Sequence, residues 1–293
     1  MKTIAIVGSG QMGGGIAQVA AQKGYEVLLA DMSVEHAEKG KANIKKGLGK
    51  LVEKTKITQA DADSTLSRIR PVGSYADFKN ADFIVEAATE RVDLKFKIFK
   101  ELDEVARPGV ILASNTSSIS ITQIAAQTKR PGEVVGMHFM NPVPVMKLVE
   151  GIRGLRTTDA TFATMKNFAE KLDKTVVEAN DFPGFAVNRI LMPMINEAVF
   201  ALYEGVAGVA DIDIAMKLGT NQPMGPLTLA DFIGLDTCLA IMKVLHDGLG
   251  DSKYRPSPLL QQYVDAGLLG RKSGIGFYDY RKGDPVVADP RKA

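Results

Sequence analysis

The sequence has a single cysteine, Cys238, no tryptophan and three histidines among its 293 residues. One cysteine excludes an internal disulfide bond, so we expect the chain to work in a reducing compartment, the cytoplasm. The histidines, His36, His138 and His246, are widely separated, and none joins a cysteine or carboxylate at the spacing of metal ligands. The sequence therefore predicts no metal site.

Long apolar runs and excess charge are also missing. No window approaches the roughly 20 uninterrupted apolar residues that a membrane-spanning helix needs. The short apolar run at residues 4–7 ends at once in Gly8, Ser9 and Gly10, which favours a strand over a signal peptide. A formal net charge of +2 gives no general attraction to nucleic acid. We therefore expect a soluble protein with neither a membrane nor a nucleic-acid partner.

Short β-branched or aliphatic runs alternate with helical patterns through the first two thirds of the chain. This alternation is typical of a doubly wound, Rossmann-type α/β fold with a mainly parallel sheet. The predicted strands are residues 3–7, 26–30, 82–86, 110–113, 134–138 and 175–178. Helices are predicted at 33–53 and 93–106, and Thr58 to Asp61 reads as the capping box of another.

The pattern changes in the turn-rich segment 180–185, after which the periodicity is helical. We therefore predict a dinucleotide-binding domain over 1–182 and a smaller all-helical domain over 183–293. The excursion between residues 33 and 67 is too long for one crossover helix, so it predicts a protruding helical hairpin in the first domain.

A glycine-rich turn follows the first predicted strand and opens a helix. It matches the pattern G-x-G-x-x-G with Gly8, Ser9, Gly10, Gln11, Met12 and Gly13. Such a turn brings backbone amides and a helix N-terminus to a pyrophosphate. Asp31 ends the second strand, where a carboxylate binds the adenosine ribose and repels the extra phosphate of NADP. The alternative is a turn that serves packing alone, but strand, spacing and acid together favour NAD.

Further motifs lie in a specific order along the chain. They are 114–118 (SNTSS), 138–142 (HFMNP), Glu150, 181–189 (DFPGFAVNR), 223–227 (PMGPL) and 272–278 (KSGIGFY). Together they resemble the L-3-hydroxyacyl-CoA dehydrogenase family, particularly its bacterial 3-hydroxybutyryl-CoA members. The resemblance implies an NAD-dependent oxidoreductase that acts on a short-chain CoA thioester, the pair 3-hydroxybutyryl-CoA and acetoacetyl-CoA, and forms a homodimer through its second domain.

The resemblance also implies catalytic roles. His138 would take the proton of the substrate hydroxyl, and Glu150 would hold the imidazole and stabilise its charged form. Histidine suits this step because its ordinary pKa of about 6.5 lets it exchange a proton near neutrality. Ser117 and Asn188 would position the C3 oxygen. From the residues alone, His138 can also be read as a core histidine and Ser117 as a helix cap.

Further family positions contact the cofactor. Glu90 and Lys95 match residues at the nicotinamide ribose, and Ser117, Asn141 and Lys272 match other cofactor contacts. Surface salt bridging is the competing interpretation of Lys95 and Lys272.

Seven lysines lie between residues 39 and 56, and Lys46, Lys50 and Lys54 recur every four residues. On a helix this spacing places like charges on one face, where they repel each other unless an anion is near. Because the family binds the phosphorylated nucleotide of CoA beside such a hairpin, we expect Lys54, then Lys50, to contact phosphate. A solvated basic face is the alternative.

Two other functions fit parts of the sequence. One is an NAD-linked hydroxyacid or polyol dehydrogenase of the same design, whose substrate carries no CoA. The other is a non-catalytic dinucleotide-binding protein, because a fold alone does not establish chemistry.

Overall fold

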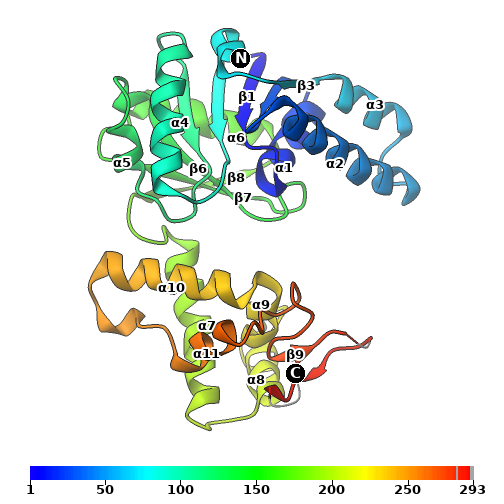
Figure 1. Cartoon of the computed structure of the whole chain (residues 1–293), viewed down its shortest axis with the longest axis vertical. Helices are drawn as coiled ribbons and strands as arrows, with labels where there is room; N and C mark the ends of the chain where they lie inside the picture. Colours follow the sequence, from blue (N-terminus) through cyan, green and yellow to red (C-terminus); the bar gives the residue numbers. More distant parts are fainter. Residues whose placement is uncertain (282, 291–293) are drawn as a thin grey trace. The chain divides into compact units, whose positions relative to one another are not determined.

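The computed structural model describes residues 1–281 and 283–290, which form two compact units (Figure 1). The first unit is Met1–Phe185, and the second begins at Ala186. The sequence predicts this boundary after residue 182, inside the same turn-rich segment.

The first unit is built on an eight-stranded sheet with the order β3-β2-β1-β4-β5-β6-β7-β8. The strands are β1 (Thr3–Val7), β2 (Glu26–Ala30), β3 (Ile69–Val72), β4 (Phe83–Glu86), β5 (Ile111–Ser114), β6 (Val134–Phe139), β7 (Leu148–Arg153) and β8 (Thr175–Asn180). β1 to β6 run parallel, whereas β7 is antiparallel to β6 and carries β8 in its own direction. The mainly parallel, doubly wound sheet is thus confirmed.

Helices cover both faces of this sheet (Figure 1). They are α1 (Gln11–Gln22), α2 (Val34–Glu53), α3 (Gln59–Ser67), α4 (Val92–Val105), α5 (Ile121–Ala125) and α6 (Asp159–Lys171), with 3-10 turns at Tyr75–Asn80 and Pro131–Glu133. One apolar core joins α1, α2 and α6 to the sheet, and a second joins α4 and α5 to the opposite face. The chain reverses its winding direction between β1 and β4, where parallel α/β folds bind ligands at the carboxyl ends of the strands.

The predicted hairpin is present as α2 and α3, which pack on each other (Figure 1). Its capping box is confirmed. The amide of Asp61 donates to the Thr58 hydroxyl at 3.1 Å, and the amide of Thr58 donates to the Asp61 carboxylate at 3.0 Å.

Two strands of the eight-stranded sheet are absent from the sequence prediction. β3 contains Pro71, which an edge strand tolerates because one side of its backbone needs no sheet partner. In β7, Glu150 and Gly151 interrupt the apolar run. Gly151 is required there, since a Cβ atom on it would lie 2.5 Å from Met165 Cε and 2.9 Å from the Phe162 ring on α6. Close packing of α6 on the strand explains a glycine that sequence rules read as a turn.

The second unit consists mainly of helices. They are α7 (Val187–Tyr203), α8 (Val209–Gly219), α9 (Pro226–Ile233), α10 (Leu235–Leu249) and α11 (Pro258–Asp265), with a 3-10 turn at Ser252–Tyr254. The prediction of an all-helical unit needs one small correction, because β9 (Tyr278–Asp279) and β10 (Val286–Val287) form a short antiparallel pair. Within residues 1–281 and 283–290, no helix is long and apolar enough to cross a membrane.

Two buried carboxylates tie the C-terminal segment to these helices. Asp213 on α8 accepts a hydrogen bond from the Tyr278 hydroxyl at 3.0 Å. Asp231 on α9 accepts from the amides of Phe277 and Tyr278 at 3.0 and 2.9 Å and from the Tyr280 hydroxyl at 3.1 Å. Burial raises the pKa of Asp231 to about 6.

Candidate active site

The glycines of the glycine-rich turn have two different roles, close packing and access for a ligand. A Cβ atom on Gly8 would lie 2.5 Å from the carbonyl oxygen of Ala87, and one on Gly13 would lie 1.9 Å from that of Gly8. Both positions therefore accept only glycine, and Gly8 also has a φ of 95°. A Cβ atom on Gly10 would meet nothing within 4 Å. Gly8 and Gly13 thus serve packing, whereas Gly10 leaves open space at the start of α1.

The N-terminus of α1 suits an anion. Its N-cap residue is Gly10, which has no side chain to accept hydrogen bonds from the first amides, and the first turn carries no acidic residue. Unpaired amides and the positive end of the helix dipole attract phosphate oxygens. Ser9, Gln11 and Met12 flank this point, so the turn fits a dinucleotide.

Asp31 lies beside this turn at the end of β2. Its carboxylate accepts hydrogen bonds from the amide and hydroxyl of Ser9 at 2.6 and 2.7 Å and from the Met32 amide at 2.8 Å. Burial alone would raise the pKa of Asp31, but these hydrogen bonds outweigh it and hold the pKa below its ordinary value. The group is therefore a fixed anion at neutral pH.

A recess of about 170 Å³ adjoins Asp31 and Gly8 and has largely apolar walls that include Tyr75 and Ile98. Its volume and largely apolar lining fit a purine base. Tyr75 was not among the predicted site residues. It follows β3, a strand that the sequence did not reveal, so no signal pointed to it.

Lys95 on α4 is buried, with 1% of its surface exposed. Its Nζ atom lies 2.6 Å from Glu86 Oε1 and 3.4 Å from Glu90 Oε2. Glu86 also accepts a hydrogen bond from the Ser114 hydroxyl at 2.6 Å. The surface salt bridge considered for Lys95 is therefore wrong, because the ion pair lies under the carboxyl ends of β4 and β5.

Glu90 connects this ion pair to the loop that carries Ser117. Its Oε1 atom accepts hydrogen bonds from the Thr116 hydroxyl at 2.5 Å and from the amides of Ser117 and Ser118 at 2.8 and 3.0 Å. Burial would raise the pKa of Glu90, but Lys95 and these donors lower it below its ordinary value.

Ser117 does not cap the following helix. The N-cap of α5 is Ser120, whose hydroxyl accepts from the amide of Gln123 at 3.2 Å. Ser117 lies three residues earlier, and its hydroxyl is 3.3 Å from Glu90 Oε1. The helix-cap interpretation is therefore wrong, and this hydroxyl lies in the loop after β5.

His138 and Glu150 form a pair across β6 and β7. The two residues are directly opposite in the antiparallel register, and His138 Nδ1 lies 2.8 Å from Glu150 Oε2. Glu150 is fully buried and His138 is 8% exposed. The Phe185 ring lies 5.9 Å from the imidazole. Because Nδ1 faces the carboxylate, Nε2 is the ring nitrogen left to exchange a proton with a substrate.

The loop between β6 and β7 approaches α1. The Gln11 side-chain amide donates to Asn141 Oδ1 at 2.9 Å, which joins two predicted cofactor residues. Next to them is a groove of about 350 Å³, lined by glycines of α1, by residues of α2 and by Asn141 to Pro144. Its walls are largely uncharged.

The lysine-rich face lies on α2. Lys50 is in the last turn of this helix and Lys54 is its C-cap residue. Both are exposed, and neither takes part in an ion pair within the described part of the chain. Lys41, by contrast, donates to the carbonyl of Ile69 at 2.6 Å and so has a structural role.

Two predicted residues belong to the second unit. Asn188 lies in the first turn of α7 and is buried. Lys272 forms an ion pair with Asp236 and is partly exposed, as the salt-bridge interpretation expects. The ion pair does not test the predicted contact of Lys272 with the cofactor, which stays a prediction.

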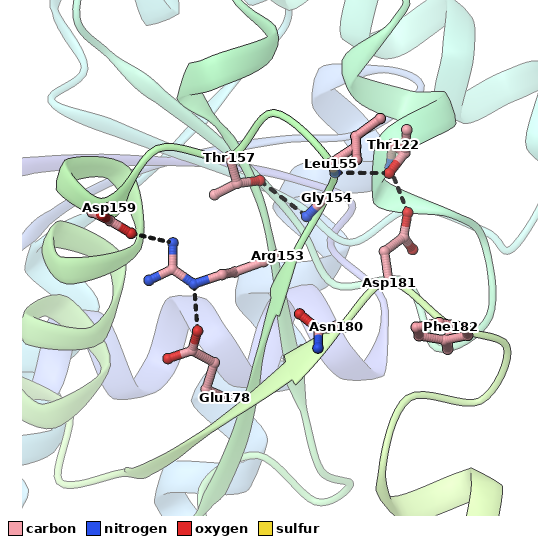
Figure 2. Close-up of a pocket in the computed structure, with 10 residues that line it drawn as sticks. All are labelled: Thr122, Arg153, Gly154, Leu155, Thr157, Asp159, Glu178, Asn180, Asp181 and Phe182. Atoms are coloured by element: carbon pink, nitrogen blue, oxygen red, sulfur yellow. Dashed lines mark hydrogen bonds and ion pairs between the residues drawn. The ribbon is translucent and has the colours of Figure 1, made fainter.

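A larger cavity, of about 670 Å³, contains none of the predicted catalytic side chains (Figure 2). In Figure 2 the Arg153 guanidinium lies between Asp159, at 3.0 Å, and Glu178, and Asp181 points to the start of α5. Asp181 accepts hydrogen bonds there from the Thr122 amide at 2.7 Å. The ion pairs of Arg153 therefore hold α6, β7 and β8 together, and Asp181 fixes the start of α5.

The geometry agrees with comparisons to known proteins. Residues 3–182 match the family model described as 3-hydroxyacyl-CoA dehydrogenase, NAD binding domain. Residues 184–280 match the model for the C-terminal domain of the same enzymes. The two matches cover most of the chain.

Individual relatives are similar over their whole length. The chain is 57% identical over 282 residues to a probable 3-hydroxybutyryl-CoA dehydrogenase of Bacillus subtilis (strain 168), covering 96% of this chain and 98% of that protein. It is 55% identical over 286 residues to a 3-hydroxybutyryl-CoA dehydrogenase of Bradyrhizobium diazoefficiens, covering 98% of each. The crystal structure of (S)-3-hydroxybutyryl-CoA dehydrogenase from Ralstonia eutropha superposes with a TM-score of 0.93 at 52% identity, covering 96% of this chain and 100% of that one.

Proposed function

This chain belongs to the NAD-dependent 3-hydroxyacyl-CoA dehydrogenase family, and we propose that its substrates are short-chain (S)-3-hydroxyacyl-CoA and 3-oxoacyl-CoA thioesters. The pair 3-hydroxybutyryl-CoA and acetoacetyl-CoA is the proposed one, in keeping with the names of its relatives. The observation that carries the proposal is the contact between His138 and Glu150. A buried carboxylate against an imidazole is the arrangement that a general base needs.

His138 acts as the general base in the oxidative direction. Bound NAD would supply the acceptor for the hydride that leaves C3. The hydroxyl proton passes to His138 Nε2, the C3–O bond becomes a carbonyl, and Glu150 stabilises the imidazolium across the Nδ1 contact. In the reductive direction the imidazolium returns this proton to the oxygen.

The loop around Ser117 supplies the contact to the C3 oxygen. With substrate bound, Ser117 turns its hydroxyl hydrogen from Glu90, 3.3 Å away, to that oxygen. Glu90 keeps the loop in place through the two amides it binds. Glu90 and Lys95 also set the ribose side of the site, Lys95 acting through Glu90 because its own ammonium is buried. Asn188 is proposed as the second ligand of the C3 oxygen, and Lys272 as a further cofactor contact; both assignments rest on family resemblance.

The CoA portion follows the groove beside α1. An uncharged groove suits the pantetheine arm, which has amide groups and no charge. The nucleotide end carries phosphates, and Lys54 and Lys50 on the hairpin offer exposed ammonium groups for them. These contacts to the CoA portion would distinguish the proposed substrate from a free hydroxyacid.

We further propose a homodimer formed through the second unit and a cytoplasmic location. The second unit exposes large apolar side chains, among them Ile190, Val206 and Leu218. Exposed apolar surface of this kind marks interfaces. The proposed location is supported by the presence of a single cysteine, Cys238, which is free in this structure. A monomer in sedimentation velocity at micromolar concentration would refute the dimer.

The test of the function is NADH oxidation with acetoacetyl-CoA beside free acetoacetate. We expect kcat/KM for the thioester to exceed that for the acid by about 10³ or more, because the CoA portion supplies binding energy remote from C3. Equal rates with both would favour a hydroxyacid dehydrogenase. No turnover with either would favour a binding protein.

A further inference from the structure

Lys174 is a buried lysine between α6 and β8 that the proposed reaction does not use. It is 6% exposed, and its Nζ atom donates to the carbonyl oxygens of Val143 at 2.6 Å and Met146 at 2.7 Å. Burial lowers the pKa of Lys174. The adjacent carboxylate, Asp173, pairs with Lys23, the C-cap residue of α1. Burying an ammonium group costs free energy unless it is hydrogen-bonded. The two carbonyl contacts at one loop therefore indicate that Lys174 has a specific role there.

The contacted loop, residues 140–147, connects the strands that carry the catalytic pair. Val143 is buried, and a Cβ atom on Gly15 of α1 would lie 2.8 Å from Val143 Cβ. Gln11 donates to Asn141 at the start of the loop. The loop is therefore held between α1 and the Lys174 ammonium.

We propose that Lys174 is a positioning residue for this loop. By fixing the carbonyls of Val143 and Met146, it sets the distance between the loop and α1, and hence the width of the groove that both of them line. The identity of the groove's occupant, the pantetheine arm, rests on the proposed function. The loop contacts themselves do not.

Positioning of this kind has a kinetic signature. His138 and Glu150 are paired by strand register, which continues into β8 on one side and β5 on the other. Loss of the ammonium would therefore displace the loop and leave the catalytic pair in place. A variant without the ammonium should therefore bind the CoA thioester less tightly and keep its kcat.

Lys174→Met has nearly the same length and no donor, and Lys174→Arg keeps donors. Lys171→Met, an exposed lysine at the end of α6, is the matched control. For Lys174→Met we expect KM for acetoacetyl-CoA to rise about tenfold with kcat within about threefold of wild type. Lys174→Arg should recover part of the loss, and the control should match wild type.

Hydrogen exchange supplies a readout that is independent of turnover. The amides of Val145 and Met146 donate to the carbonyl of Pro142 inside the loop. In Lys174→Met they should exchange at least about tenfold faster, whereas the amides of β6 and β7 should not change. If Lys174→Met does not fold, Lys174→Gln, which keeps one donor group, carries the same comparison.

Unchanged exchange in the loop, or a fall in kcat with KM unchanged, would overturn the proposal. If wild type fails to reduce acetoacetyl-CoA, the proposed function is wrong, and the exchange comparison still decides the role of Lys174.

Discussion

Glu150→Gln removes the negative charge beside the catalytic imidazole and keeps the size of the side chain. The amide has the shape of the carboxylate, and its oxygen can still accept a hydrogen bond from His138 Nδ1, which lies 2.8 Å from Glu150 in the native protein. Because Glu150 is fully buried, solvent cannot replace the lost charge. The variant therefore isolates the electrostatic part of the pair.

The size of the effect follows from Coulomb's law. Two unit charges about 4 Å apart, the scale of a carboxylate and an imidazolium ring, attract by about 4 kcal/mol at an effective dielectric constant near 20. The proton is only partly transferred in the transition state, so about half of this energy, roughly 2 kcal/mol, acts on the barrier at minimum. At 1.36 kcal/mol for each factor of ten, kcat should fall between about 30-fold and 1,000-fold.

The assay is steady-state oxidation of (S)-3-hydroxybutyryl-CoA with NAD, the direction in which the imidazolium forms, together with the dissociation constant of NADH from fluorescence titration. NADH binding should stay within about twofold, since Glu150 acts through His138. Glu178→Gln, on the neighbouring strand β8 and exposed, is the matched control and should retain wild-type kcat. A Glu150→Gln enzyme with native melting temperature and unchanged kcat would refute the role of this carboxylate.

Three further predictions concern separate parts of the molecule. Lys54→Glu should raise KM for acetoacetyl-CoA about tenfold and leave KM for NADH unchanged, and the control Lys79→Glu should change neither. A wild-type KM for acetoacetyl-CoA in Lys54→Glu would show that Lys54 does not contact the substrate. Gly13→Ala should abolish NADH binding or folding, because its Cβ would lie 1.9 Å from a carbonyl oxygen. A folded variant that binds NADH with the wild-type dissociation constant would contradict this. Burial raises the pKa of Asp231 to about 6, above its unfolded value near 3.9, so its stabilising contribution is fully present below about pH 4 and is lost as pH rises through 6. Relative to Asp231→Asn, wild type should therefore lose about 3 kcal/mol of unfolding free energy between pH 4 and pH 7 in urea titrations, and a constant difference would show that the folded pKa is ordinary.

The sequence predicts the dinucleotide half of the site well because its signals are local. A strand, a glycine-rich turn and a helix follow one another within 22 residues, and the two glycines with steric demands lie in the turn itself. Asp31 follows the next strand directly. Local order along the chain is enough to place such groups together at one edge of a parallel sheet.

The catalytic half depends on contacts that no local pattern encodes. The partnership of His138 and Glu150 comes from the antiparallel register of β7 on β6, and β7 was not predicted because Glu150 and Gly151 break its apolar run. Both residues have tertiary reasons, a paired imidazole for one and the close approach of α6 for the other. The resemblance to a family supplied this pair where residue patterns could not.

Buried polar groups were the least predictable. From the sequence alone Lys95 is read as a surface residue, yet it is buried below the carboxyl ends of β4 and β5, between Glu86 and Glu90. Lys174 gives no sequence signal at all, since its partners are backbone carbonyls. Partners of this kind are decided by packing, which overrides the ordinary preference of lysine for solvent.

The central claim is that His138 transfers the substrate proton, and single-turnover reduction of acetoacetyl-CoA by NADH in a stopped-flow instrument tests it most directly. His138→Asn should bind NADH as wild type does and lose a factor of about 10² to 10⁴ in the rate of NADH consumption at saturating thioester. His246→Asn, at a partly exposed histidine in the second unit, should show no loss. A wild-type rate in His138→Asn would contradict the account.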